Sequence, residues 1–139
     1  MRIDKTALDG AAARVGDRWS LRVIAALFDG DKTFGELSEE VSGIAPNILA
    51  ARLRALERDA LISSRPYQHR PVRMRYSLTT PGRRLADAVA LLAEWGSKLG
   101  GESTGLRHET CGTSLELRPW CLTCETVAEP GSEGDLVWV

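Results

Sequence analysis

The chain has 139 residues, of which 43% are hydrophobic and 27% charged, and its formal net charge is −1. These values are typical of an ordinary globular protein with one domain and at most a small appendage. No apolar run approaches the length of a membrane span and no signal-peptide pattern is present, so we expect a cytoplasmic protein. The three cysteines all lie beyond residue 110, and an odd count in that compartment argues against a disulfide framework.

The charges are distributed unevenly along the chain. Residues 52–84 contain nine arginines and two acidic residues, a local charge of +7. Residues 100–139 contain two arginines and seven acidic residues, a local charge of −5. The local field attracts phosphate more than the total charge does, so the basic middle of the chain indicates a nucleic-acid partner.

Two helices are predicted before the basic region. Residues 6–15 form a short, alanine-rich helix that is too weakly apolar to be stable alone. It must therefore pack on its own domain or on a second subunit. Residues 18–29 form a helix with a broad apolar face, which Gly30 ends.

A helix-turn-helix is predicted over residues 33–58. Thr33 and Glu36 have the spacing of a capping box, so a helix should begin at Phe34. Gly43 suits the turn that follows, and Pro46 suits the first turn of a second helix over 46–58.

The second helix has two faces of different composition. Its buried stripe consists of Leu49, Leu53 and Leu56. A second stripe consists of Asn47, Ala51, Arg54 and Arg58 and carries no acidic residue. One packed face and one basic face are what a DNA-reading helix needs, although an arginine-bearing face is also commonly just solvated.

A β-hairpin is predicted directly after this helix. Its strands span residues 62–67 and 73–78, and its loop spans residues 68–72 with His69 and Arg70 at the tip. A hairpin in this position is a wing, whose tip can reach sugar-phosphate or the minor groove. The arginines could instead protect a strand edge, but no acidic residue occurs from 63 through 82, and this bias favours DNA contact.

The last long helix begins at Thr80-Pro81-Gly82 and continues to about residue 98. Leu85, Val89, Leu92 and Trp95 belong to an apolar face larger than a small winged domain can cover. We expect this face to form a dimer interface with the N-terminal helix, the alternative being intramolecular core.

The tail carries two pairs of metal-ligand type, each with a spacing of two residues. His108 and Cys111 form the first pair, Cys121 and Cys124 the second, and residues 112–120 lie between them. Three thiolates and one imidazole suit a tetrahedral zinc ion, so the pattern resembles a zinc ribbon with a structural Zn²⁺. The alternatives are an apo tail with three reduced thiols, or a disulfide between Cys121 and Cys124.

The chain resembles the HxlR-type winged helix-turn-helix regulators. The resemblance covers roughly residues 6–98 and lies in these segments: Val15–Trp19, Phe34–Leu37, Gly43-Ile44, Leu49–Glu57, Tyr76–Thr79 with Gly82, and Glu94-Trp95. It implies a dimeric transcriptional regulator that reads DNA with helix 46–58 and wing 62–78. The dimer would form through the N-terminal helix and helix 81–98.

Three positions differ from the family pattern. Thr6 lies about where many members carry a redox-sensing cysteine, Ala45 replaces the usual hydroxyl cap, and Ala50-Ala51 replace longer polar side chains. Asn47 and Arg54 are then the best candidates for reading adenine and guanine. The complete set of candidate DNA contacts is Lys32, Thr33, Asn47, Ala51, Arg52, Arg54, Arg58, His69, Arg70, Arg73 and Arg75.

The predicted fold class is α+β: a winged helix-turn-helix domain over residues 1–99 and a zinc-ribbon-like extension over 100–139. The predicted function is sequence-specific DNA binding by a homodimeric regulator, a repressor that occludes promoters, with a small-molecule effector left open. One alternative is a metal- or redox-responsive sensor that uses the tail. Another is a winged-helix module for protein contacts without DNA binding. An enzyme is not expected, because two histidines are too few for a general base and ligands together.

Overall fold

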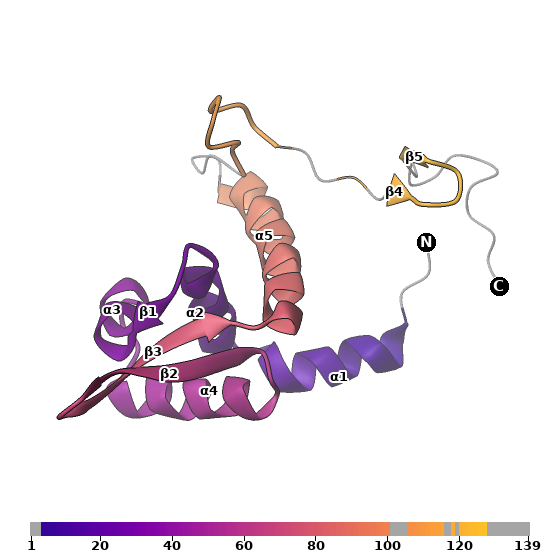
Figure 1. Ribbon diagram of the computed structural model, residues 1–139. Helices are drawn as coiled ribbons and strands as arrows, with labels where there is room; N and C mark the ends of the chain where they lie inside the picture. The colour runs from indigo at the N-terminus through magenta and orange to yellow at the C-terminus, as the bar shows by residue number, and fades with distance from the viewer. Residues whose placement is uncertain (1–3, 101–105, 116–117, 119, 128–139) are drawn as a thin grey trace.

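The computed structural model describes residues 4–100, 106–115, 118 and 120–127. In this part of the chain the helices are α1 (Lys5–Val15), α2 (Arg18–Phe28), α3 (Phe34–Glu40), α4 (Pro46–Arg58) and α5 (Thr80–Gly100). The strands are β1 (Lys32–Thr33), β2 (Ile62–His69), β3 (Val72–Leu78), β4 (Trp120–Cys121) and β5 (Thr126–Val127). The predicted α+β class is confirmed, and the helices gather around a small antiparallel sheet (Figure 1).

Helix α2 lies at the centre of the core and contacts α1, α3, α4 and α5. Asp17 caps its first turn by accepting hydrogen bonds from the backbone N–H groups of Trp19 and Ser20. Val23, Ile24 and Leu27 are fully buried in the same cluster as the leucines of α4. The central helix is thus covered on several sides, which is why it carries the broadest buried face of the chain.

The helix-turn-helix forms as predicted. At the start of α3 the Thr33 side chain accepts from the Glu36 N–H at 3.3 Å, and the Glu36 carboxylate accepts from the Thr33 N–H at 2.6 Å. Gly43 has a φ of +83°, which a residue with a β-carbon rarely adopts. Helix α4 begins at Pro46 without a side-chain cap from Ala45, and its three predicted leucines are buried. The capping box, glycine turn and leucine stripe are all confirmed.

The wing spans residues 62–78 as predicted, but its strands are longer and its turn is tighter than predicted. Strands β2 and β3 pair from Ile62↔Leu78 out to His69↔Val72, so the predicted loop over 68–72 is wrong and only residues 70–71 connect the strands. The first strand was predicted to end at Tyr67 but continues to His69, with Pro66 inside it. The sheet order is β1-β3-β2, so β2 is an edge strand, where a missing N–H is tolerated. The third strand, β1, was not predicted.

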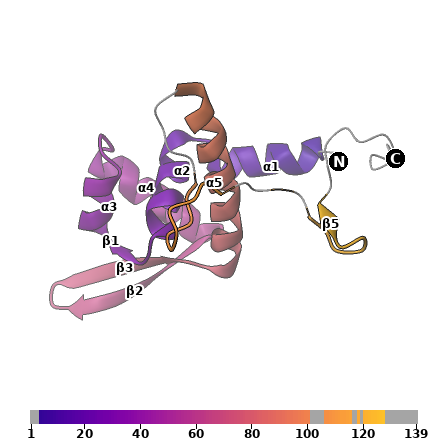
Figure 2. The same cartoon turned by 90° about the horizontal axis from the view of Figure 1, so that it is seen from above.

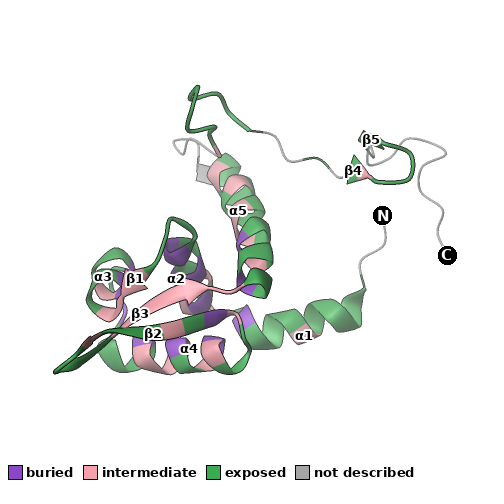
Figure 3. Cartoon of the chain, viewed as in Figure 1, coloured by how far each residue is buried: buried purple, intermediate pink, exposed green. Residues whose placement is uncertain are grey.

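Helix α5 is packed at its start and exposed further along. Gly82 and Ala86 are buried, whereas large apolar side chains in the second half of the helix are exposed, namely Leu91, Leu92, Trp95 and Leu99 (Figure 3). The reason is that this half of the helix extends away from the other helices of the core (Figures 1 and 2). Among the described helices, none is both long and apolar enough to cross a membrane.

Candidate nucleic-acid interface

Helix α4 presents an exposed polar face beside the wing. Asn47, Arg54 and Arg58 are exposed, while Leu49, Leu53 and Leu56 face the core (Figure 3). The helix contacts strand β2, and the Ser64 hydroxyl donates a hydrogen bond to the Glu57 carboxylate across this contact. The helix and the wing therefore lie side by side. Ala51, on the same helix, is half-buried.

The tip of the wing is exposed. His69, Arg70 and Arg73 are all exposed. The Gln68 side-chain amide donates to the Arg70 carbonyl at 3.1 Å and braces the turn. The arginines at the tip have no hydrogen bond or ion pair from their own guanidinium groups to the rest of the described chain. Their charge is thus available to an external anion.

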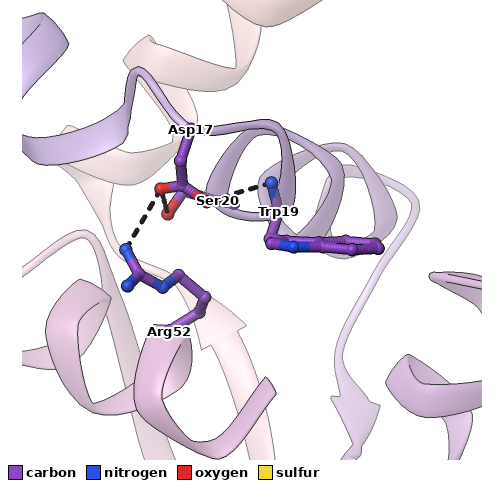
Figure 4. A network of polar contacts seen from close by, with 4 residues as sticks. All are labelled: Asp17, Trp19, Ser20 and Arg52. Atoms are coloured by element: carbon purple, nitrogen blue, oxygen red, sulfur yellow. Dashed lines mark hydrogen bonds and ion pairs between the residues drawn. The ribbon is translucent and has the colours of Figure 1, made fainter. Parts of the chain in front are cut away.

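Arg52 lies on α4 but binds the start of α2. Its Nη1 lies 3.2 Å from Oδ2 of Asp17, the residue that caps α2 (Figure 4). Ser20, which is fully buried, donates its hydroxyl to the same oxygen at 2.6 Å. Burial raises the pKa of Asp17, but the hydrogen bonds from Ser20 and the charge of Arg52 outweigh it, so the pKa lies below its ordinary value. Arg52 therefore joins α4 to the central helix α2.

Asp31, between α2 and β1, holds the base of the wing in a similar way. Arg65 Nη2 lies 2.9 Å from the Asp31 carboxylate, and Arg75 Nη1 donates to the Asp31 carbonyl at 3.3 Å. Arg65 and Arg75 are directly opposite each other in the β2–β3 ladder. Lys32, the next residue, pairs with Glu40 at 2.8 Å. Of the candidate phosphate contacts, Lys32 is thus already paired with a carboxylate, and Arg75 already donates to a backbone carbonyl.

Sequence reasoning missed Asp17 and Asp31 because it considered the arginines without their partners. One signal was available for Asp17: an acidic residue directly before a helix is a preferred N-cap. No local signal could identify Arg52 as its partner, because 35 residues separate the two. Only the packing of α4 against α2 brings them together.

In the tail, the structure assembles the predicted metal ligands only in part. His108 Nδ1 and Cys111 Sγ are 3.2 Å apart, and the pKa of the Cys111 thiol is lowered to about 7, first by hydrogen bonding with Thr113 and then with His108. Cys121 is the last residue of β4, and Cys124 lies on the turn between β4 and β5. Among the residues that the structure describes, no three histidine, cysteine or acidic side chains meet as a metal site. The zinc ion therefore stays a prediction.

Comparison with known proteins agrees with this architecture. Residues 14–104 match the HxlR-like helix-turn-helix family, which is more than half of the chain. The protein belongs to the HxlR-like helix-turn-helix family. The match spans α2 through α5, so it includes α4 and the whole wing.

Individual relatives show the same fold. The HTH-type transcriptional regulator Mb3122 of Mycobacterium bovis is 35% identical over 127 residues, which cover 88% of this chain and 80% of that protein. Residues 1–100 make up less than three quarters of the chain, whereas the similarity covers 88% of it. The similarity therefore continues beyond α5 into the tail. A crystal structure of a MarR-family regulator from Enterococcus faecalis V583 is 31% identical, with a TM-score of 0.62 over 73% of this chain and 93% of that one. Diamide-treated YodB from Bacillus subtilis is 30% identical, with a TM-score of 0.57 over 70% of this chain and 95% of that one.

Proposed function

We propose that the protein is a transcriptional regulator that binds double-stranded DNA as a homodimer and represses by occluding promoters. The observation that carries the proposal is the contact between α4 and the wing, two elements on which Arg54, Arg58, Arg70 and Arg73 are exposed. Membership of a helix-turn-helix family and relatives described as transcriptional regulators support it. Helix α4 would enter the major groove while the wing tip lies on the backbone or in the adjacent minor groove.

The arginines divide into two groups with different roles. Arg54 and Asn47 would read base edges from α4, and Arg58, Arg70 and Arg73 would neutralise phosphates. Arg52 and Arg75 would instead orient α4 and the wing through Asp17 and Asp31. The Arg52 Nε is buried and has no hydrogen-bond partner among the described residues, so a phosphate oxygen could not reach that edge without movement.

The first test measures binding to DNA against salt concentration. The affinity of the wild-type protein should fall linearly on a log–log plot, with a slope of about −0.9 for each phosphate contacted. Arg73→Ala should make this slope shallower, because it removes a contact from each protomer. Arg14→Ala is the matched control, since Arg14 is an exposed arginine on α1 that donates to Gly10. A wild-type protein without salt-dependent affinity for any duplex would contradict the proposed function.

The second test distinguishes an orienting role for Arg52 from a phosphate-binding role. The two roles predict opposite changes in DNA affinity when Asp17 loses its charge. Asp17→Asn should preserve the helix cap, because asparagine caps about as well as aspartate, but it removes the carboxylate that holds Arg52. If Arg52 orients α4, DNA affinity should fall by about tenfold at an unchanged salt slope. If Arg52 contacts only phosphate, losing a nearby negative charge should raise the affinity instead. Asp59→Asn, an exposed acid at the end of α4, is the control for the charge change alone.

The homodimer is proposed from exposed apolar surface on two helices. In α5 the exposed side chains are Leu91, Leu92, Trp95 and Leu99, and in α1 the exposed side chain is Leu8. Side chains of this size are enriched in interfaces, and a two-fold pair would place two α4 helices on one face of a duplex. Sedimentation analysis at micromolar concentration should therefore give twice the chain mass, and a monomer at all concentrations would contradict it.

A further inference from the structure

The two metal-ligand pairs of the tail lie on turns of the same construction. In the first turn Gly112 N–H donates to the His108 carbonyl at 2.7 Å, and in the second Glu125 N–H donates to the Cys121 carbonyl at 2.9 Å. In both, the bond joins a residue to the fourth residue after it. The residue that follows the second ligand has a positive φ in each case, +70° at Gly112 and +53° at Glu125.

The strands that flank the two turns also correspond. Around the first turn Arg107 pairs with Ser114, and His108 N–H donates to the Thr113 carbonyl at 2.9 Å. Around the second, Trp120 pairs with Val127 and Cys121 with Thr126. The spacings of the paired residues are the same in both hairpins. The same local structure therefore occurs twice in the tail. Each copy carries two side chains of metal-ligand type, three residues apart, at its turn.

The positive φ at Glu125 is informative because glutamate has no intrinsic preference for it. A non-glycine residue in this region carries a conformational cost, and such strain is a reason to look for a function. The first turn has a glycine at the corresponding position, where the same conformation costs little. The same backbone shape at both positions, with different residues, indicates that the turn itself matters.

The described part of the tail buries little apolar surface. Leu122 is 86% exposed and Trp120 is 57% exposed. Units of this size without an apolar core usually depend on disulfides or a metal ion. A structural zinc ion can contribute roughly 10 kcal/mol or more to the folding of such a unit.

We propose that the tail binds one zinc ion through His108, Cys111, Cys121 and Cys124. The 3.2 Å between His108 Nδ1 and Cys111 Sγ is close to the roughly 3.6 Å expected for neighbouring ligands of a tetrahedral zinc ion. The two turns lie apart in this structure (Figures 1 and 2), so the second pair must approach the first. The nine residues from 112 to 120 can span about 30 Å when extended and allow this approach. Four protein ligands leave no open position, so the ion is structural rather than catalytic.

The test uses the full chain, purified under reducing conditions, stripped with a chelator and reloaded with Zn²⁺ or Co²⁺. Elemental analysis should give one zinc per chain, and Co²⁺ should give the absorption of a tetrahedral thiolate site. Cys111→Ser and Cys124→Ser, one from each turn, should each weaken zinc retention by at least tenfold. His69→Ala removes the other histidine of the chain and should retain the metal fully.

Other outcomes would overturn the proposal. Failure of the wild-type chain to retain zinc, or an octahedral Co²⁺ spectrum, would exclude the site. Zinc retained equally by Cys124→Ser would show that the first turn binds metal without the second, for instance between two chains. A disulfide between Cys121 and Cys124 under reducing conditions would exclude them as ligands. None of these results depends on DNA binding, so the outcome is independent of the proposed function.

Discussion

Helices α2 and α5 pack against each other, but the chain covers their apolar faces to very different extents. Val23, Ile24 and Leu27 of α2 are at most 1% exposed, whereas Trp95 of α5 is 61% exposed. Helix α2 is surrounded by its own chain, and only the first turns of α5 are. An amphipathic pattern in the sequence therefore does not ensure burial within the protomer, and the exposed half of α5 is the surface on which the proposed dimer depends.

The largest expected effect is on α2. Leu27→Ala should lower the free energy of unfolding by about 3 kcal/mol, because it removes a fully buried side chain and leaves a cavity. Urea denaturation followed by circular dichroism measures this loss. The neighbouring Phe28 is 43% exposed, so Phe28→Ala should cost much less. Equal losses of unfolding free energy in the two variants would contradict an α2 face that buries Leu27 and leaves Phe28 partly exposed.

The next effect concerns the packed start of α5. A β-carbon at Gly82 would lie 1.9 Å from the Leu61 carbonyl oxygen, which is backbone and cannot move aside easily. Gly82→Ala should therefore cost about 2 kcal/mol of unfolding free energy. Gly96 lies on the same helix and has nothing within 4 Å of such a β-carbon, so Gly96→Ala should cost nothing. A harmless Gly82→Ala would mean that the start of α5 does not approach the Leu61 backbone as closely.

In the exposed half of α5, we expect a substitution to weaken dimerisation rather than to lower the free energy of unfolding. Trp95→Ala should weaken dimerisation by roughly 30-fold, or about 2 kcal/mol, because a tryptophan in a buried interface is a common hot spot. Analytical ultracentrifugation gives the dissociation constant. Trp120 in the tail is exposed to a similar degree, so Trp120→Ala is the control for loss of an exposed indole. If both variants remain dimeric, the dimer does not use α5.

The smallest effect concerns α3, which depends on a local cap rather than on a broad face. Thr33→Ala should cost about 1 kcal/mol at pH 7, because the capping box loses its side-chain acceptor. The pKa of Glu36 is lowered, first by the hydrogen bond from the Thr33 backbone N–H and second by the Thr33 side chain, and only the second effect is lost in Thr33→Ala. A lowered carboxyl pKa stabilises the fold above the ordinary value of 4.5, and this contribution is lost as the pH falls through the folded-state pKa. The cost of Thr33→Ala should therefore be smaller in acid, and urea denaturation at several pH values tests this.

The local elements were predictable because their signals lie within a few residues. Thr33 with Glu36, Gly43 and Pro46 each specify a helix end by backbone chemistry. Leu49, Leu53 and Leu56 share a helical face and are buried together. The wing was predicted as an element, but its loop was predicted over residues 68–72, whereas Gln68 and His69 still pair with β3. Pro66 is accommodated only because β2 is at the edge of the sheet, which local sequence does not reveal.

By itself, the sequence determined the helix ends, the buried stripes, the basic middle and the spacing of the tail's ligand pairs, because each depends on near neighbours or on composition. Only the tertiary structure decided how the arginines are used. The Asp17–Arg52 contact and the contacts of Asp31 with Arg65 and Arg75 join residues more than 30 positions apart. Such pairs exist because helices and strands pack at particular places, and that packing is a property of the whole fold rather than of any short segment.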